Sequence, residues 1–259
     1  MSESNEQLYY REFGDAKNPP LVIVHGLYGD SVSMAPLAEK FADTFRVIAI
    51  DALGHGASPR PVGFTLEDQA LAINALIESL GYDSVTLLGV SMGSYLAAQT
   101  AILYPARVSN LVLVVTKGHG KTSSVVAYAQ RHGFDLATAS MEETLVFMSG
   151  AVWAPTTSDE QRAAIMTAQG EAPVLTPDDR AAIDRSLQDF DLRPGLPSIT
   201  APTLVISGRF DGLNPPEAGE EVASLIPGAT FAVYENSGHM LAYEEADRLV
   251  AEVEAAVLP

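Results

Sequence analysis

The sequence of 259 residues contains no cysteine, so it can form no disulfide bond, no thiolate metal site and no cysteine nucleophile. Basic residues are also scarce. Only 15 Lys and Arg stand against 33 Asp and Glu, which gives a formal net charge of −18. Binding to phosphate groups requires clustered Lys and Arg, and the sequence has no such cluster. We therefore expect neither nucleic acid nor an anionic membrane surface as a partner.

Long hydrophobic runs are missing as well. Apolar stretches such as residues 111–115 are much shorter than the roughly 18 residues that a membrane span needs. The first seven residues are polar and acidic, without the basic and apolar regions of a secretory signal. Hydrophobic residues make up 47% and charged residues 19%, which is typical of a globular protein with a substantial core. We expect a cytoplasmic protein with no membrane partner.

Six short runs have the pattern of buried parallel strands, because each is rich in Val, Ile and Leu and nearly continuous in apolar character. They are Leu21–Val24, Phe45–Ile50, Val85–Leu88, Leu111–Val115, Thr203–Ser207 and Thr230–Tyr234. Helical patterns lie between or after them, at Thr65–Leu80, Met92–Tyr104 and Tyr243–Val257. The alternation predicts an α/β fold with a doubly wound, mostly parallel sheet, and we expect Leu8–Phe13 to add a strand or a hairpin at its edge.

This alternation stops between residues 117 and 198. The stretch contains no convincing strand, but it contains helical segments separated by Gly and Pro. These are Val125–His132, Met141–Phe147, Asp159–Gln169 and Pro177–Asp189. An insertion of this size is too long for a loop. The sequence therefore predicts a core of residues 1–116 and 199–259, with a helical cap of residues 117–198 inserted between two strands.

A candidate nucleophile lies in the motif Gly89-Val90-Ser91-Met92-Gly93, which follows one predicted strand and precedes a predicted helix. The pattern Gly-x-Ser-x-Gly occurs often by chance, but between a strand and a helix it is typical of a nucleophile elbow. Ser91 would then occupy a strained turn, with its hydroxyl at the positive end of the following helix. The alternative is an ordinary serine that caps a helix.

A serine hydroxyl needs a base, and the base needs an acid that orients it. Among five histidines, His239 is the best candidate for the base, because it follows the last strand and precedes the last helix. Asp211 follows the strand before that one, and the order Ser91, Asp211, His239 is the order expected for this elbow. An exposed loop aspartate and a structural histidine are the alternatives. The N–H groups of Leu27 and Met92 are the expected oxyanion donors.

The remaining histidines are interpreted differently. His25 and His55 lie in Gly-containing turns, and we expect structural roles for them. His119 follows the strand Leu111–Val115, so both a pocket position and solvent exposure are open. His132 lies in the predicted cap and has no assigned role.

Several motifs together resemble the α/β-hydrolase superfamily, and above all its small esterases, lactonases and cofactor-free perhydrolases with a helical cap. They are His25-Gly26, the turn Asp51-Ala-Leu-Gly54-His55-Gly56-Ala-Ser58, the Gly89–Gly93 elbow, Gly208 to Asp211, and Gly238-His239. One departure is Ser94, where family members often have a second glycine. A serine at position 91, rather than an aspartate, disfavours haloalkane dehalogenase and epoxide hydrolase chemistry.

The resemblance implies a serine hydrolase that cleaves esters or lactones through an acyl-enzyme, with Ser91 as nucleophile, His239 as base and Asp211 as its orienting acid. It requires no cofactor and no metal, and no metal-ligand spacing appears in the sequence. The expected partner is a small-molecule ester or lactone. The open alternatives are C–C bond hydrolysis or perhydrolysis with the same residues, and a small-molecule receptor built on the hydrolase scaffold.

The substrate pocket is expected between the cap and the edge of the sheet. Its expected lining residues are Phe147, Met148, Val152, Trp153, Leu213, Met240 and, as one alternative, His119. For the aromatic residues, packing within the cap is the alternative. This set favours short to medium acyl chains or an aromatic ester. Lys117, Arg131 and Arg209 are the cations that would add a charge to the pocket if they pointed into it.

Overall fold

The computed structural model describes residues 7–170 and 173–258. The polar N-terminal stretch, on which the expectation about a secretory signal depends, lies almost wholly outside these ranges. In the residues that are described, no helix is both long and apolar enough to cross a membrane.

One sheet runs through the described chain, and its seven strands have the order β1-β3-β2-β4-β5-β6-β7. The strands are β1 Tyr10–Phe13, β2 Pro20–Val24, β3 Arg46–Ile50, β4 Val85–Val90, β5 Val108–Val114, β6 Thr203–Gly208 and β7 Thr230–Tyr234. Only β1 is antiparallel to its neighbour, and every other pairing is parallel. The predicted fold class and the edge strand are confirmed.

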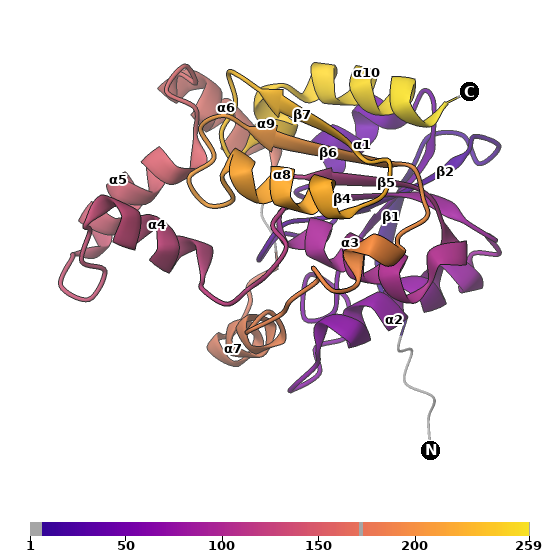
Figure 1. Cartoon of the computed structure of the whole chain (residues 1–259), viewed down its shortest axis with the longest axis horizontal. Coiled ribbons are helices and arrows are strands. Elements are labelled where there is room, and N and C mark those ends of the chain that lie inside the picture. The colour runs from indigo at the N-terminus through magenta and orange to yellow at the C-terminus, as the bar shows by residue number, and fades with distance from the viewer. Residues whose placement is uncertain (1–6, 171–172, 259) are drawn as a thin grey trace.

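Helices cover both faces of the sheet because the strands are apolar on both faces (Figure 1). In β2, for example, Val22 and Val24 pack into one core cluster, while Leu21 and Ile23 pack into the other. Helices α2 (Leu66–Ser79), α3 (Met92–Leu103) and α8 (Pro216–Leu225) contribute to the first cluster. Helices α1 (Ala35–Phe41), α9 (Leu241–Glu244) and α10 (Ala246–Val257) contribute to the second.

The predicted C-terminal helix Tyr243–Val257 is interrupted in the structure. It is divided into α9 and α10 at Glu245, whose φ of −128° and ψ of 44° are not helical. Two tertiary hydrogen bonds accompany this break: the Ser237 hydroxyl donates to Glu245, and the Gly238 N–H donates to Glu244. The prediction of one continuous helix was therefore wrong at this residue.

The chain between β5 and β6, where the sequence predicts a helical insertion of residues 117–198, is helical. Its described part contains α4 Ser124–His132, α5 Met141–Val152, α6 Asp159–Ala168 and α7 Pro177–Ser186. Capping boxes begin three of these helices, at Ser140, Ser158 and Thr176. Helix α5 continues five residues beyond the predicted end at Phe147. Figure 1 shows α4, α5 and α6 together beyond one end of the sheet, with α7 apart from them.

Candidate active site

Ser91 lies at the sharp turn between β4 and α3. Its backbone has a φ of 54° and a ψ of −118°, a region that a residue with a side chain rarely adopts. The turn is possible because the residues two positions before and after Ser91, Gly89 and Gly93, are glycines: a Cβ atom at Gly93 would collide with the carbonyl oxygen of Val24. The motif thus places the Ser91 hydroxyl at the carboxyl edge of the sheet, as an elbow requires.

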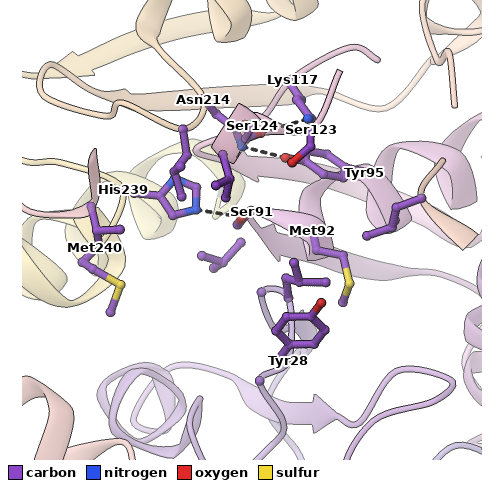
Figure 2. A pocket seen from close by; sticks show the side chains of 18 of the residues that line it. Tyr28, Ser91, Met92, Tyr95, Lys117, Ser123, Ser124, Asn214, His239 and Met240 are labelled. Carbon is purple, nitrogen blue, oxygen red and sulfur yellow. Dashed lines mark hydrogen bonds between the residues drawn. The ribbon is translucent and has the colours of Figure 1, made fainter. Parts of the chain in front are cut away.

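His239 and Asp211 form a hydrogen-bonded chain with Ser91. The His239 Nε2 atom lies 2.8 Å from Ser91 Oγ, and Nδ1 lies 2.8 Å from Asp211 Oδ2. Figure 2 shows the bond between His239 and Ser91 in the pocket. The Asp211 side chain is 0% exposed and that of His239 is 12% exposed. Asp211 Oδ1 also accepts the N–H groups of Leu213 and Asn214, each at 2.8 Å, so both carboxylate oxygens have partners.

The loops after β6 and β7 meet closely, and this contact brings Asp211 to His239. The N–H of Phe210 donates to the carbonyl of Ser237 at 2.9 Å. Gly208 is required at the contact, since a Cβ atom there would collide with the carbonyl oxygen of Gly238. Backbone contacts therefore hold the loop after β6 against the loop after β7, and with them Asp211 beside His239.

The segment that follows α5 is attached to the same loop by the Glu244 carboxylate. One of its oxygens accepts the Gly238 N–H at 2.7 Å, and the other accepts the Ala154 N–H at 2.9 Å and the Thr157 hydroxyl. The Met240 N–H also donates to the Val152 carbonyl at 3.3 Å. The C-terminal end of α5 and the His239 loop are thus joined by several hydrogen bonds.

Two backbone N–H groups near Ser91 are available to an incoming oxygen atom. Within the described residues, neither Leu27 N–H nor Met92 N–H donates a hydrogen bond to another group. Met92 begins α3, where the first N–H groups of a helix have no acceptor inside the helix. The loop that contains Leu27 is close to the nucleophile, because a Cβ atom at Gly26 would lie 3.5 Å from Ser91 Cβ. The geometry suits the oxyanion donors expected from the sequence.

A cavity of about 1190 Å³ opens over Ser91 and His239, between the edge of the sheet and the helical insertion. Five of the expected lining residues lie in its wall: Met148, Val152, Trp153, Leu213 and Met240. The wall is predominantly apolar, as the sequence indicated.

Phe147 and His119 are not among the residues that line this cavity. The Phe147 ring instead stacks on Phe134 with ring centres 4.0 Å apart, so it belongs to the packing inside the insertion. His119 forms a β-bridge with Asp191, and its Nδ1 atom accepts the Lys121 N–H at 3.4 Å. Helical spacing placed Phe147, and the position after a strand placed His119, in segments near the cavity. These signals did not give the direction of the two side chains.

Sequence reasoning missed a polar network on one wall of the cavity. The Lys117 ammonium donates to the Ser124 hydroxyl at 2.9 Å, which donates to Asn214 Oδ1 at 3.0 Å. Asn214 Nδ2 donates to the Tyr95 hydroxyl at 2.6 Å and to the Val115 carbonyl at 2.7 Å. A signal for Tyr95 was present in the sequence: it lies four residues after Ser91, on the same face of α3.

Of the three cations considered for the pocket, only Lys117 lines it. Arg131 donates to the carbonyl of Gly212, and Arg209 forms an exposed ion pair with Glu235. No group of three or more His, Asp or Glu side chains that could hold a metal ion occurs among the described residues.

His25 and His55 are buried behind the Leu27 loop. The His25 Nδ1–H donates to the Gly26 carbonyl at 2.7 Å, and its Nε2 accepts the Ala52 N–H at 3.0 Å. The two rings lie 4.8 Å apart. Burial lowers the pKa of both imidazoles, that of His55 to about 3. Both stay neutral at neutral pH, which agrees with structural roles.

The chain belongs to the alpha/beta hydrolase fold family, whose family model matches residues 19–246. The resemblance seen in the sequence motifs is thereby confirmed. Parallel strands with helices on both faces and a Ser-His-Asp arrangement at their carboxyl edge agree with this family.

The chain is similar over nearly its whole length to three proteins of known name. It is 29% identical over 262 residues to 3-oxoadipate enol-lactonase 2 of Acinetobacter baylyi, covering 99% of this chain and 95% of that protein. It is 25% identical over 260 residues to the pimeloyl-[acyl-carrier protein] methyl ester esterase of Aliivibrio salmonicida, covering 97% and 96%. The solved enol-lactonase of Burkholderia xenovorans LB400 superposes with a TM-score of 0.82 at 23% identity, covering 97% and 96%, which shows a shared fold.

Proposed function

We propose that the protein hydrolyses carboxylic esters or lactones of small substrates through an acyl-enzyme on Ser91. The observation that supports this most directly is the hydrogen-bonded chain from Asp211 through His239 to Ser91, with both distances 2.8 Å, next to a largely apolar cavity. The esterase and lactonase names of the relatives agree with it.

In the first step, Ser91 Oγ attacks the carbonyl carbon of the ester while His239 Nε2 accepts the hydroxyl proton. Asp211 holds the imidazole with its proton on Nδ1, so that Nε2 is free to act as the base. The carbonyl oxygen becomes an oxyanion, which accepts the N–H groups of Leu27 and Met92. His239 then gives its proton to the leaving alcohol oxygen, and the acyl group stays on Ser91.

In the second step, His239 removes a proton from a water molecule that attacks the acyl-enzyme. The same two N–H groups stabilise the second tetrahedral intermediate, and its collapse releases the acid and restores the Ser91 hydroxyl. Each proton passes through His239, and the reaction needs no further reagent than water.

The helical insertion, residues 117–198, acts in this proposal as a cap that covers the site and selects the substrate. Residues of the insertion such as Met148 and Trp153 share the cavity wall with core residues such as Met92 and Met240. An ester bound there is largely removed from bulk water, which strengthens its interactions with the oxyanion donors.

Stopped-flow kinetics with 4-nitrophenyl butyrate tests the proposal. We expect a burst of 4-nitrophenol equal to the enzyme concentration, followed by slower turnover, and we expect Ser91→Ala to abolish both. In mass spectrometry, a fluorophosphonate should label the wild type once, by covalent reaction with Ser91, and should not label Ser91→Ala. The exposed serine variant Ser109→Ala provides the matched control and should label fully.

Full activity in Ser91→Ala would refute the proposal. Cleavage of a C–C bond, or perhydrolysis, without any release from esters would replace it by one of the other serine-dependent reactions. Saturable binding of the ester without a burst would favour a receptor on the hydrolase scaffold.

A further inference from the structure

Lys117 is a cation in the wall of a largely apolar cavity. It follows β5 at the carboxyl edge of the sheet, and its side chain is half-buried. Its Nζ atom lies 5.8 Å from the centre of the Tyr95 ring and 5.9 Å from that of Phe190. Both rings face a positive charge at distances where cation–π attraction is significant. The surroundings of this ammonium group are therefore aromatic and partly shielded from water.

The charge of Lys117 has no counter-ion in the described part of the chain. No carboxylate oxygen there lies within 4.0 Å of its Nζ atom, and the Ser124 hydroxyl is its hydrogen-bond partner. Burial is the cause that lowers the pKa of this lysine to about 8. An ammonium group has three N–H donors, and one of them is used by Ser124. The remaining donors need acceptors, and the cavity is where a ligand can supply them.

The other cations that line the cavity have acceptors in the protein. Lys121 lies 3.7 Å from the Asp191 carboxylate, and Arg185 donates to the Val62 carbonyl at 3.0 Å. In a chain with a net charge of −18, an unpaired ammonium group inside the candidate active site is exceptional. Its local environment favours an anion.

Lys117 is connected to the Asp211 carboxylate by hydrogen bonds through Ser124 and Asn214. Ser124 donates to the side chain of Asn214, and the backbone N–H of Asn214 donates to Asp211 Oδ1. Asn214 is buried, and its side-chain amide is bonded to Tyr95 as well. The ammonium group is thus held at a defined place relative to Ser91, which a binding subsite requires.

The alcohol part and the acyl part of a bound ester lie on different sides of Ser91. His239 must reach the leaving oxygen, so the alcohol part lies on the histidine's side of Ser91. In the view of Figure 2, His239 and Met240 lie to one side of Ser91, whereas Lys117 and Tyr95 lie to the other. The ammonium group therefore faces the acyl part of a bound ester.

We propose that Lys117 forms a carboxylate-binding subsite, and that the substrates are esters or lactones whose acyl chain ends in a carboxylate group. The inference rests on the proposed ester hydrolysis at Ser91 and specifies its substrate class. An apolar chain would contact the hydrophobic wall, while its terminal carboxylate accepts the free N–H groups of Lys117. The bound anion would also supply the counter-ion that the chain lacks at this position.

Paired esters with one leaving group test this subsite. The substrates are 4-nitrophenyl hydrogen adipate and 4-nitrophenyl hexanoate, which have acyl chains of equal length that end in a carboxylate and in a methyl group. The measured quantity is the ratio of kcat/KM for the adipate to that for the hexanoate. We expect Lys117→Met, which keeps most of the apolar stem, to lower this ratio by about tenfold or more, as for the loss of a charged hydrogen bond. Lys117→Arg should restore most of it.

Lys40→Met is the control, because it removes a lysine that has an acidic partner, Asp247, and does not line the cavity, and its ratio should stay within about threefold of the wild type. A ratio in Lys117→Met within about threefold of the wild type would overturn the subsite. If Lys117→Met does not fold, product inhibition of the wild type tests the subsite instead. Tighter inhibition by adipate than by hexanoate supports the subsite. Equal or weaker inhibition by adipate overturns it. Absence of any Ser91-dependent release from either ester would refute the hydrolase proposal itself.

Discussion

Replacing Asp211 by asparagine changes one atom and should nearly abolish the reaction. In the structure, Asp211 Oδ1 accepts the N–H groups of Leu213 and Asn214, and Oδ2 accepts the proton of His239 Nδ1. An asparagine must keep its oxygen toward the two N–H donors, because its NH₂ group cannot accept from them. Its NH₂ group therefore points at the imidazole and donates to Nδ1.

This reversed hydrogen bond forces the His239 proton onto Nε2, the atom that must accept the Ser91 proton. The neutral imidazole is then held in the wrong tautomer, and the cation formed during attack loses its acidic partner. Loss of an orienting aspartate in this way lowers kcat by about 10⁴-fold in a serine protease. We expect a decrease of the same order, with a fold that remains intact since the two residues have nearly the same shape.

Burst kinetics with 4-nitrophenyl butyrate at pH 7, together with the thermal unfolding midpoint, measures both parts of this prediction. Asp83→Asn, which removes one charge from an exposed loop, is the control and should keep wild-type kinetics. A kcat for Asp211→Asn within tenfold of the wild type would show that the carboxylate does not set the tautomer of His239, and the mechanism above would have to be abandoned.

Other parts of the structure lead to further predictions. Because the buried His55 has a pKa near 3 instead of 6.5, its contribution to stability is complete above pH 6.5 and is lost as the pH falls toward 3; this amounts to about 2 kcal/mol at pH 5. Between pH 7 and pH 5, the free energy of unfolding measured in urea should therefore fall less in His55→Gln than in the wild type, by this amount. An equal fall in the two proteins would contradict the prediction. Gly93→Ala should lower the thermal midpoint by more than about 6 °C, because its methyl group meets the Val24 carbonyl; a midpoint within 2 °C of the wild type would disagree. Trp153→Ala should shift the preferred ester toward longer acyl chains in a panel from acetate to octanoate, and an identical profile would remove this side chain from the substrate's path.

The arrangement of the site could be predicted from the sequence to the extent that strand ends determine it. Ser91, Asp211 and His239 each follow a strand of a parallel sheet, and all carboxyl ends of such a sheet lie at one edge. Their hydrogen bonds in the structure follow from that rule together with the chain order. Buried strands were recognised for a similar reason, since both faces of the sheet are covered and the runs are apolar throughout.

Side-chain direction and tertiary hydrogen bonds could not be derived in this way. Phe147 was expected in the pocket, but stacking on Phe134 turns it into the insertion. The break at Glu245 carries no Gly or Pro signal, and the hydrogen bonds of neighbouring carboxylates to the loop before His239 accompany it. Helices α1 and α8 were not predicted, although each begins with a proline in its first turn, which is a recognisable start signal.

The Glu244 carboxylate couples the movement of the helical insertion to that of the loop that contains His239. It bonds the Gly238 N–H on one side and Ala154 with Thr157 on the other, so the end of α5 and the histidine's loop have to travel together. A ligand large enough to push α5 outward would pull the imidazole away from the hydroxyl of Ser91. Oversized molecules would then be rejected by misaligning the proton acceptor, even where they find room to bind.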